Sequence, residues 1–210
     1  VELQVAQGEA VDPGRLDETQ QWWEVDALLV VSTLGGLIDL VGRLDRPAEL
    51  LDLMQRGIET IDRVWYPYAQ AIIRLSALFA GQVADLAGRG HDVAALREES
   101  DTCTDRLAEL VAIEGEEIGP ESQAWLRRHD AERLRIAAVT GERPDPDALV
   151  EAWRETTEAF ASLANRPEHA RSVARHAEAL VLVGRPAEAR EAAATARTVA
   201  EELGARPVLD

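Results

Sequence analysis

The sequence predicts an all-α protein built from about four helical hairpins. Three observations predict this fold class. Apolar residues recur at helical spacing along nearly the whole chain, and no six-residue stretch alternates as a strand would. Aromatic residues, which strands favour, make up only 4% of the 210 residues. Breaks rich in proline and glycine recur along the chain, and residues 45–50 and 184–189 are nearly the same turn, which is typical of a repeat protein.

These breaks divide the chain into eight expected helices with short connections. Short connections favour antiparallel neighbours, so eight helices predict four hairpins. Residues 1–15 are polar and contain a turn signal, so we expect a linker or leading arm there, and a single helical-repeat domain over residues 16–210. The expected helices run from Leu16 or Asp17 to Arg43, Pro47 to Val64, Tyr66 to Gly88, Asp92 to Ile113, Pro120 to Thr140, Pro146 to Leu163, Pro167 to Val183 and Pro186 to Leu203.

Small residues lie at set distances from the repeated turn. Counted from Gly184, they are Ala177, Ala189 and Ala196, which match the positions where the two helices of a tetratricopeptide repeat touch. The same offsets from the earlier turns match less completely, and the turns are farther apart than in a regular array. We therefore expect an α-α superhelix, a tetratricopeptide-like solenoid. The earlier sets are Ile38, Leu50 and Gly57, and Gly81, Val93 and Ser100.

Composition argues against several classes of function. The net charge is −17 and every basic residue is arginine, so the chain should repel phosphate backbones and anionic membranes. We expect neither nucleic-acid nor membrane binding. Cys103 is the only cysteine, which excludes an internal disulfide, and no signal-peptide pattern opens the chain. A cytoplasmic location fits best. The chain begins with Val1, and we expect it to be a fragment of a larger multidomain protein.

No residue pattern predicts catalysis, a cofactor or a metal. His169 and His176 share a helical face but lack a second pair at ligand spacing, so we interpret the histidines as structural or exposed. Acidic neighbours raise the pKa of the Cys103 thiol and make it a poor nucleophile. We interpret the remaining charged clusters as solvated faces. For the cluster in the loop, cation binding is the alternative. These clusters are Glu114, Glu116 and Glu117 in a loop, and Arg127, Arg128, Asp130, Glu132, Arg133 and Arg135 on a helix.

The tryptophans are the candidates for a contact site. Large aromatic residues usually fill the space between successive hairpins, and we interpret Trp125 and Trp153 in this way. The alternative is that one or two line a groove and bind a partner. Trp22 and Trp23 point about 100° apart on a helix and cannot easily face the same core layer. One of them is therefore the candidate partner-contact residue.

The C-terminal part resembles a known helical domain. The segments that carry the resemblance are residues 169–180, Gly184 to Ala189, and Ala200 to Pro207, which ends in Leu-Gly-Ala-Arg-Pro. They resemble the tetratricopeptide-like domain of large LuxR-type and related signal-transduction ATPase transcriptional regulators of bacteria. The resemblance implies a sensor or interaction module. It would bind a protein partner or small-molecule inducer on a concave face and pass this event to an ATPase or DNA-binding domain in the same polypeptide.

Two other classes of function remain open. One is a structural scaffold or oligomerisation module without an inducer, which self-association would indicate. The other is an α-helical enzyme, which a deep polar pocket with convergent carboxylates would indicate. The sequence itself predicts no catalytic residue.

Overall fold

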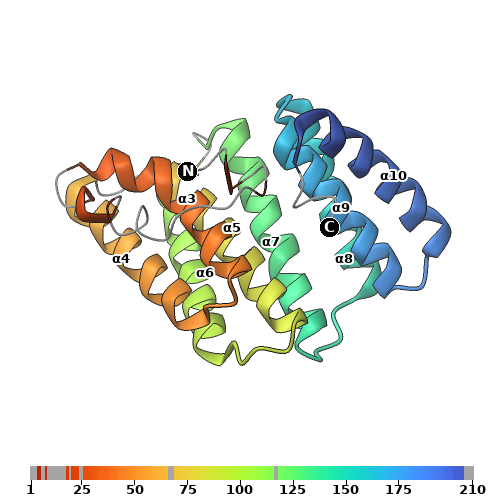
Figure 1. Ribbon diagram of the computed structural model, residues 1–210, viewed down its shortest axis with the longest axis horizontal. Helices are drawn as coiled ribbons and strands as arrows, with labels where there is room; N and C mark the ends of the chain where they lie inside the picture. Colours follow the sequence, from red (N-terminus) through yellow and green to blue (C-terminus); the bar gives the residue numbers. More distant parts are fainter. Residues whose placement is uncertain are drawn as a thin grey trace. The chain divides into compact units, whose positions relative to one another are not determined.

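The computed structural model describes residues 4–5, 8, 18, 20–23, 26–65, 69–115 and 118–205. Over this part of the chain the protein is helical and contains no strand, which confirms the all-α class (Figure 1). The helices are α3 (Ala27–Arg43), α4 (Pro47–Trp65), α5 (Ala69–Gly88), α6 (Ala94–Glu114), α7 (Pro120–Val139), α8 (Pro146–Ser162), α9 (Arg166–Leu182) and α10 (Pro186–Leu203).

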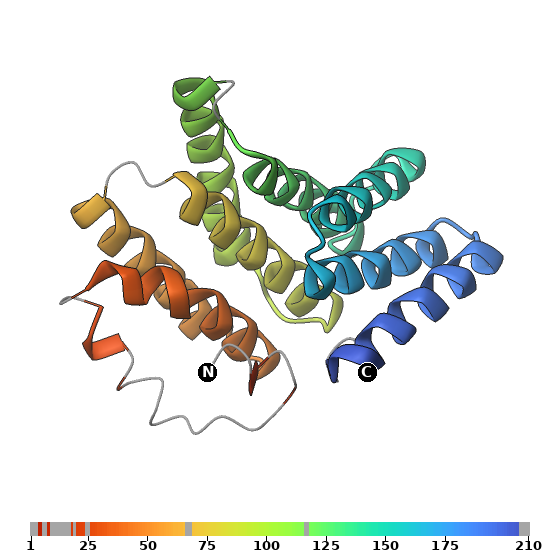
Figure 2. The ribbon, with the colours of Figure 1, turned by 90° about the horizontal axis from the view of Figure 1, so that it is seen from above.

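The chain forms two compact units. The first comprises Val1–Val5 and Glu9–Ile118, and the second comprises Ala6–Gly8 and Gly119–Asp210. In the first unit α3 packs against α4 and α5, and α5 packs against α6. In the second unit α7 packs against α8, α8 against α9 and α9 against α10, and Figure 2 shows α9 and α10 side by side. The predicted single domain over residues 16–210 stays a prediction.

Helix α5 supplies much of the core of the first unit. Phe79 and Ile72 on this helix are fully buried, as are Leu34 and Leu37 of α3. By length and hydropathy α5 is the described helix that could cross a membrane, but 78% of its most apolar stretch is buried. A core helix passes the same test, so this property establishes no location.

A tryptophan lies at the centre of the second unit's core. Trp153 of α8 is 1% exposed and belongs to one apolar cluster with Leu149, Leu180 and Ala131. Trp125 of α7 is also buried, and its ring meets Phe160 edge to face with centroids 5.0 Å apart. Both tryptophans therefore fill core space, as predicted.

The repeated turn has the same backbone conformation at both of its occurrences. Asp45 has φ 57° and Gly184 has φ 76°, so each helix ends at a left-handed residue. At the second turn the Arg185 N–H donates to the Leu180 carbonyl at 2.8 Å, and at the first the Arg46 N–H donates to the Val41 carbonyl at 3.4 Å. A hydrogen bond from an N–H to the carbonyl five residues earlier closes the C-terminal ends of many helices. Ala164, between α8 and α9, adopts the same conformation with φ 53°.

The expected first helix, from Leu16 or Asp17 to Arg43, is interrupted: the described residues 18, 20 and 21 are helical, but they do not run on continuously into α3. The backbone turns at Trp22 and Trp23, and Asp26 is extended, with φ −147° and ψ 108°. The Asp26 side chain accepts a hydrogen bond from the Leu28 N–H at 2.9 Å and caps α3. An aspartate side chain that binds nearby backbone N–H groups favours the start of a new helix over the continuation of the previous one. The chain is therefore interrupted here although the apolar pattern continues. Most of the predicted arm, residues 1–15, and residues 66–68 lie outside the described residues.

Candidate functional site

The structure separates the two candidate contact tryptophans. Trp23 is 3% exposed, and its indole N–H donates to the Thr33 hydroxyl at 3.2 Å, so it serves the core. Trp22 is 58% exposed. Of the pair, only Trp22 is accessible to a partner, and its contact role stays a prediction.

Cys103 and the two histidines of α9 are at least partly buried. Burial is the main cause that raises the pKa of the Cys103 thiol, to about 11, with the nearby Glu99 carboxylate adding to it. Burial also lowers the pKa of His169 and of His176. No three His, Cys, Asp or Glu side chains gather at metal-binding distance among the described residues.

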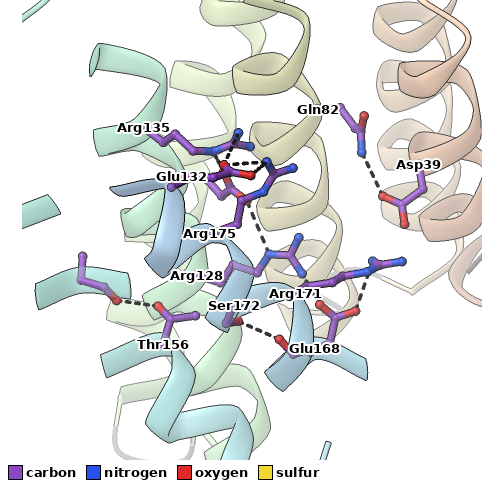
Figure 3. A network of polar contacts seen from close by, with 12 residues as sticks. Asp39, Gln82, Arg128, Glu132, Arg135, Thr156, Glu168, Arg171, Ser172 and Arg175 are labelled. Carbon is purple, nitrogen blue, oxygen red and sulfur yellow. Dashed lines mark hydrogen bonds and ion pairs between the residues drawn. The ribbon is translucent and has the colours of Figure 1, made fainter. Parts of the chain in front are cut away.

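Arginines and glutamates form a polar network between α7 and α9 (Figure 3). Its centre is Glu132, which is fully buried and accepts a hydrogen bond from Arg135 Nε at 2.7 Å. Arg128 Nε lies 3.7 Å from the other Glu132 oxygen, and the Arg128 guanidinium also pairs with Glu168 of α9. The guanidinium carbon of Arg128 lies 5.2 Å from the centroid of the Trp125 ring, a cation–π contact.

This network corrects the interpretation of the charged cluster on α7 as a solvated face. Arg127, Asp130 and Arg133 are exposed, whereas Arg128 and Glu132 are buried, as is Arg135. The buried three lie at spacings of four and three residues and therefore share one helical face. That spacing is the signal that separates them from their exposed neighbours. The alternative cation site in the 114–117 loop involves side chains outside the described residues.

A surface groove lies between α9 and α10. Its volume is about 450 Å³, and its lining is mainly apolar. The three alanines that the sequence places at the helix–helix contact are buried and form its floor: Ala177, Ala189 and Ala196. The surrounding lining residues are Ala174, Glu178, Val181, Pro186, Arg190, Ala193 and Arg197.

The groove and the polar network share one residue, Glu178. Its carboxylate pairs with Arg175 Nη1 at 2.9 Å and lies 4.0 Å from Arg135 Nη1. Glu178 also lines the groove. A change in the position of this side chain therefore reaches the buried network of α7 through Arg135.

Comparisons with known proteins place the chain in no family. No family model matches it, no similar curated protein was found, and no solved structure resembles it. The fold and the groove therefore define the protein only as an all-α protein of helical hairpins with an apolar surface groove.

Proposed function

We propose that the chain is a non-catalytic recognition module with a tetratricopeptide-like superhelical arrangement. The observation that carries this proposal is the α9–α10 groove. Buried alanines line its floor, while Val181, with 62% of its surface exposed, forms part of its wall. Exposed apolar side chains beside a groove of this kind favour binding of a partner.

The protein that contains this module is, in our proposal, a cytoplasmic transcriptional regulator of bacteria. The support is the likeness of residues 169–180, 184–189 and 200–207 to the helical domain of LuxR-type and signal-transduction ATPase regulators. The acidic charge of −17 favours a protein partner or small-molecule inducer over nucleic acid. Flanking ATPase or DNA-binding domains of the same polypeptide would receive the signal.

The signal would leave the groove through Glu178. An occupant that moves this side chain also alters its contacts with Arg175 and Arg135. Because Arg135 binds the buried Glu132, the change reaches α7. Helices α7 and α10 are the first and the last helix of this unit in chain order. Packed elements with alternative side-chain pairings are the physical basis of such coupling.

The gene that encodes the segment provides the first test. We expect a nucleotide-binding domain before the segment or a helix-turn-helix domain after it. In the complete gene product, Ala193→Trp fills the groove and should abolish the inducer response of a reporter gene. Ala187→Trp, on the same helix outside the groove lining, is the matched control and should leave the response intact. A gene without either domain contradicts the regulator assignment.

An oligomerisation module is the second candidate. Exposed Val181 and Leu182 at the end of α9 favour it, because apolar side chains at a helix end can pair between two copies. Sedimentation velocity over a hundredfold range of concentration distinguishes the two. A mass that doubles with concentration, and returns to that of one chain in Val181→Glu, supports oligomerisation.

A further inference from the structure

The α9–α10 groove is long enough for a short helix to lie along it. Its lining on α10 runs from Pro186 to Arg197, about 16 Å at the 1.5 Å rise of a helix. The lining on α9 runs from Ala174 to Val181, about 10 Å. A partner helix of three turns spans this length and presents apolar side chains at three- and four-residue intervals along one face.

The floor of the groove allows a helix to approach closely. Ala177, Ala189 and Ala196 bring only a methyl group to it, so the large side chains of the occupant fill the space between α9 and α10. A floor of larger side chains would close the same space and hold the partner's backbone farther away.

The charges at the groove define the partner more closely. Arg190 and Arg197 line it, are exposed and form no ion pair with any described residue. By contrast, Arg185 near the start of the same helix pairs with Glu188, and Glu202 at its end pairs with Arg166. In a chain with 39 acidic and 22 basic residues, two arginines at one groove that lack carboxylate partners among the described residues are a local excess of positive charge.

The one acidic side chain in the lining does not cancel this charge. Glu178 is on the opposite helix and is paired with Arg175. Arg190 and Arg197 are seven residues apart, which is two helical turns, so both lie along the same side of the groove. Two carboxylates at the same seven-residue spacing on a partner helix can pair with both.

We propose that the α9–α10 groove binds an acidic amphipathic helix of a protein partner. The partner's apolar face lies on the alanine floor, and two of its carboxylates, seven residues apart, pair with Arg190 and Arg197. The proposal rests on the proposed function and specifies the partner's chemistry.

The test uses the complete chain and a designed probe. The probe is a fluorescein-labelled, alanine-based peptide of about 18 residues, long enough to populate a helix. Leucines at three- and four-residue intervals form one face, with two glutamates seven residues apart beside it. Fluorescence anisotropy should show saturable binding. R190E/R197E should weaken it about tenfold or more, because two pairs are replaced by repulsion.

Two controls make the result specific to the groove. R127E/R133E changes the net charge by the same amount on α7, at exposed arginines outside the groove, and should leave the peptide affinity unchanged. A second peptide, with arginine in place of each of the two glutamates, should bind R190E/R197E more tightly than it binds the parent chain. Circular dichroism checks that all variants keep their helix content.

Three results would overturn the proposal. They are no saturable binding of the acidic peptide, equal weakening by both double variants, and self-association of the chain that R190E/R197E abolishes, which would identify a second copy as the occupant. If the gene contains regulator domains but the peptide does not bind, only the partner's chemistry is wrong. If the peptide binds but the gene lacks those domains, the regulator assignment alone fails.

Discussion

At the scale of single residues, Glu132 is the clearest example of a charge that the fold depends on. It is fully buried, and its carboxylate lies between Arg135 Nε, at 2.7 Å, and Arg128 Nε, at 3.7 Å. We expect Glu132→Gln to lower the free energy of unfolding by about 3 kcal/mol, because it leaves buried guanidinium charge without its partner. Urea denaturation followed by circular dichroism measures this loss.

The matched control is the same substitution at an exposed ion pair. Glu151 pairs with Arg154 Nη2 at 2.5 Å on the surface of α8. Solvent screens this pair, so Glu151→Gln should leave the urea midpoint essentially unchanged. Equal effects of the two substitutions would show that the buried network contributes no more to stability than a surface pair.

His176 makes stability depend on pH near neutrality. Burial, followed by the positive charges of Arg185 and Arg154, lowers its pKa in the folded chain below the ordinary value. Below about pH 6.5 the unfolded chain therefore binds more protons, and stability falls as the pH decreases toward the folded-state pKa. His169 contributes in the same direction, because burial lowers its pKa too.

We therefore expect the melting temperature to fall between about pH 7.5 and pH 5.5, and to fall less in the His176→Gln variant. Differential scanning fluorimetry at several pH values measures both. The pKa values of Glu151 and Glu188 are lowered by hydrogen bonds from their arginine partners, so both carboxylates stay ionised across this pH range and do not cause the change. An identical pH dependence in the variant would exclude His176 as the cause.

At the scale of helices, left-handed residues mark the turns that follow several helices, among them Asp45, Ala164 and Gly184. Ala164 adopts φ 53°, and its Cβ makes this conformation unfavourable. Ala164→Gly should raise the free energy of unfolding by about 0.5–1 kcal/mol, whereas Gly184→Ala, at φ 76°, should lower it by about 1 kcal/mol. Chemical denaturation of the two variants measures these opposite changes in the free energy of unfolding. A loss of stability in Ala164→Gly would contradict this explanation of the turn.

The same turns explain how far the sequence predicts the helices. Pro186 and Gly204 bound α10, and the expected range from Pro186 to Leu203 is the observed one. The turn at Ala164 contains no glycine, yet Asn165 caps α9 by accepting a hydrogen bond from the Glu168 N–H at 3.3 Å. The interruption seen at Trp22, Trp23 and Asp26 was not predicted, because a single aspartate cap outweighs an apolar pattern that continues across it.

The candidate site was only partly predictable for a related reason. The small residues at Ala177, Ala189 and Ala196 follow from their spacing around Gly184. That Arg190 and Arg197 pair with no carboxylate of the described residues does not follow from the sequence, because whether an arginine meets a carboxylate depends on side chains from neighbouring helices. Helical spacing alone separates Glu132 from its exposed neighbours, but burial of its face depends on tertiary packing.

At the scale of the whole molecule, repulsion between acidic residues is the main electrostatic effect. The chain has 17 more acidic than basic residues, and repulsion among them opposes the compact state. The surface ion pairs, such as Arg185 with Glu188, offset little of this repulsion because solvent screens them. Added salt weakens both the repulsion and the ion pairs. Because the repulsion is the larger of the two, its loss determines whether salt raises or lowers the stability.

We therefore expect sodium chloride to stabilise the protein. Raising its concentration from about 20 mM to about 500 mM shortens the screening length to a few ångströms and should raise the melting temperature by several degrees. The E109R/E155R variant, whose two exposed glutamates lie one in each unit, has a net charge of −13 and should gain less from salt. A melting temperature that falls with salt would mean instead that the ion pairs outweigh the repulsion. Their combined contribution would then have to exceed the sum expected for independent surface pairs, as in a connected network such as that around Glu132.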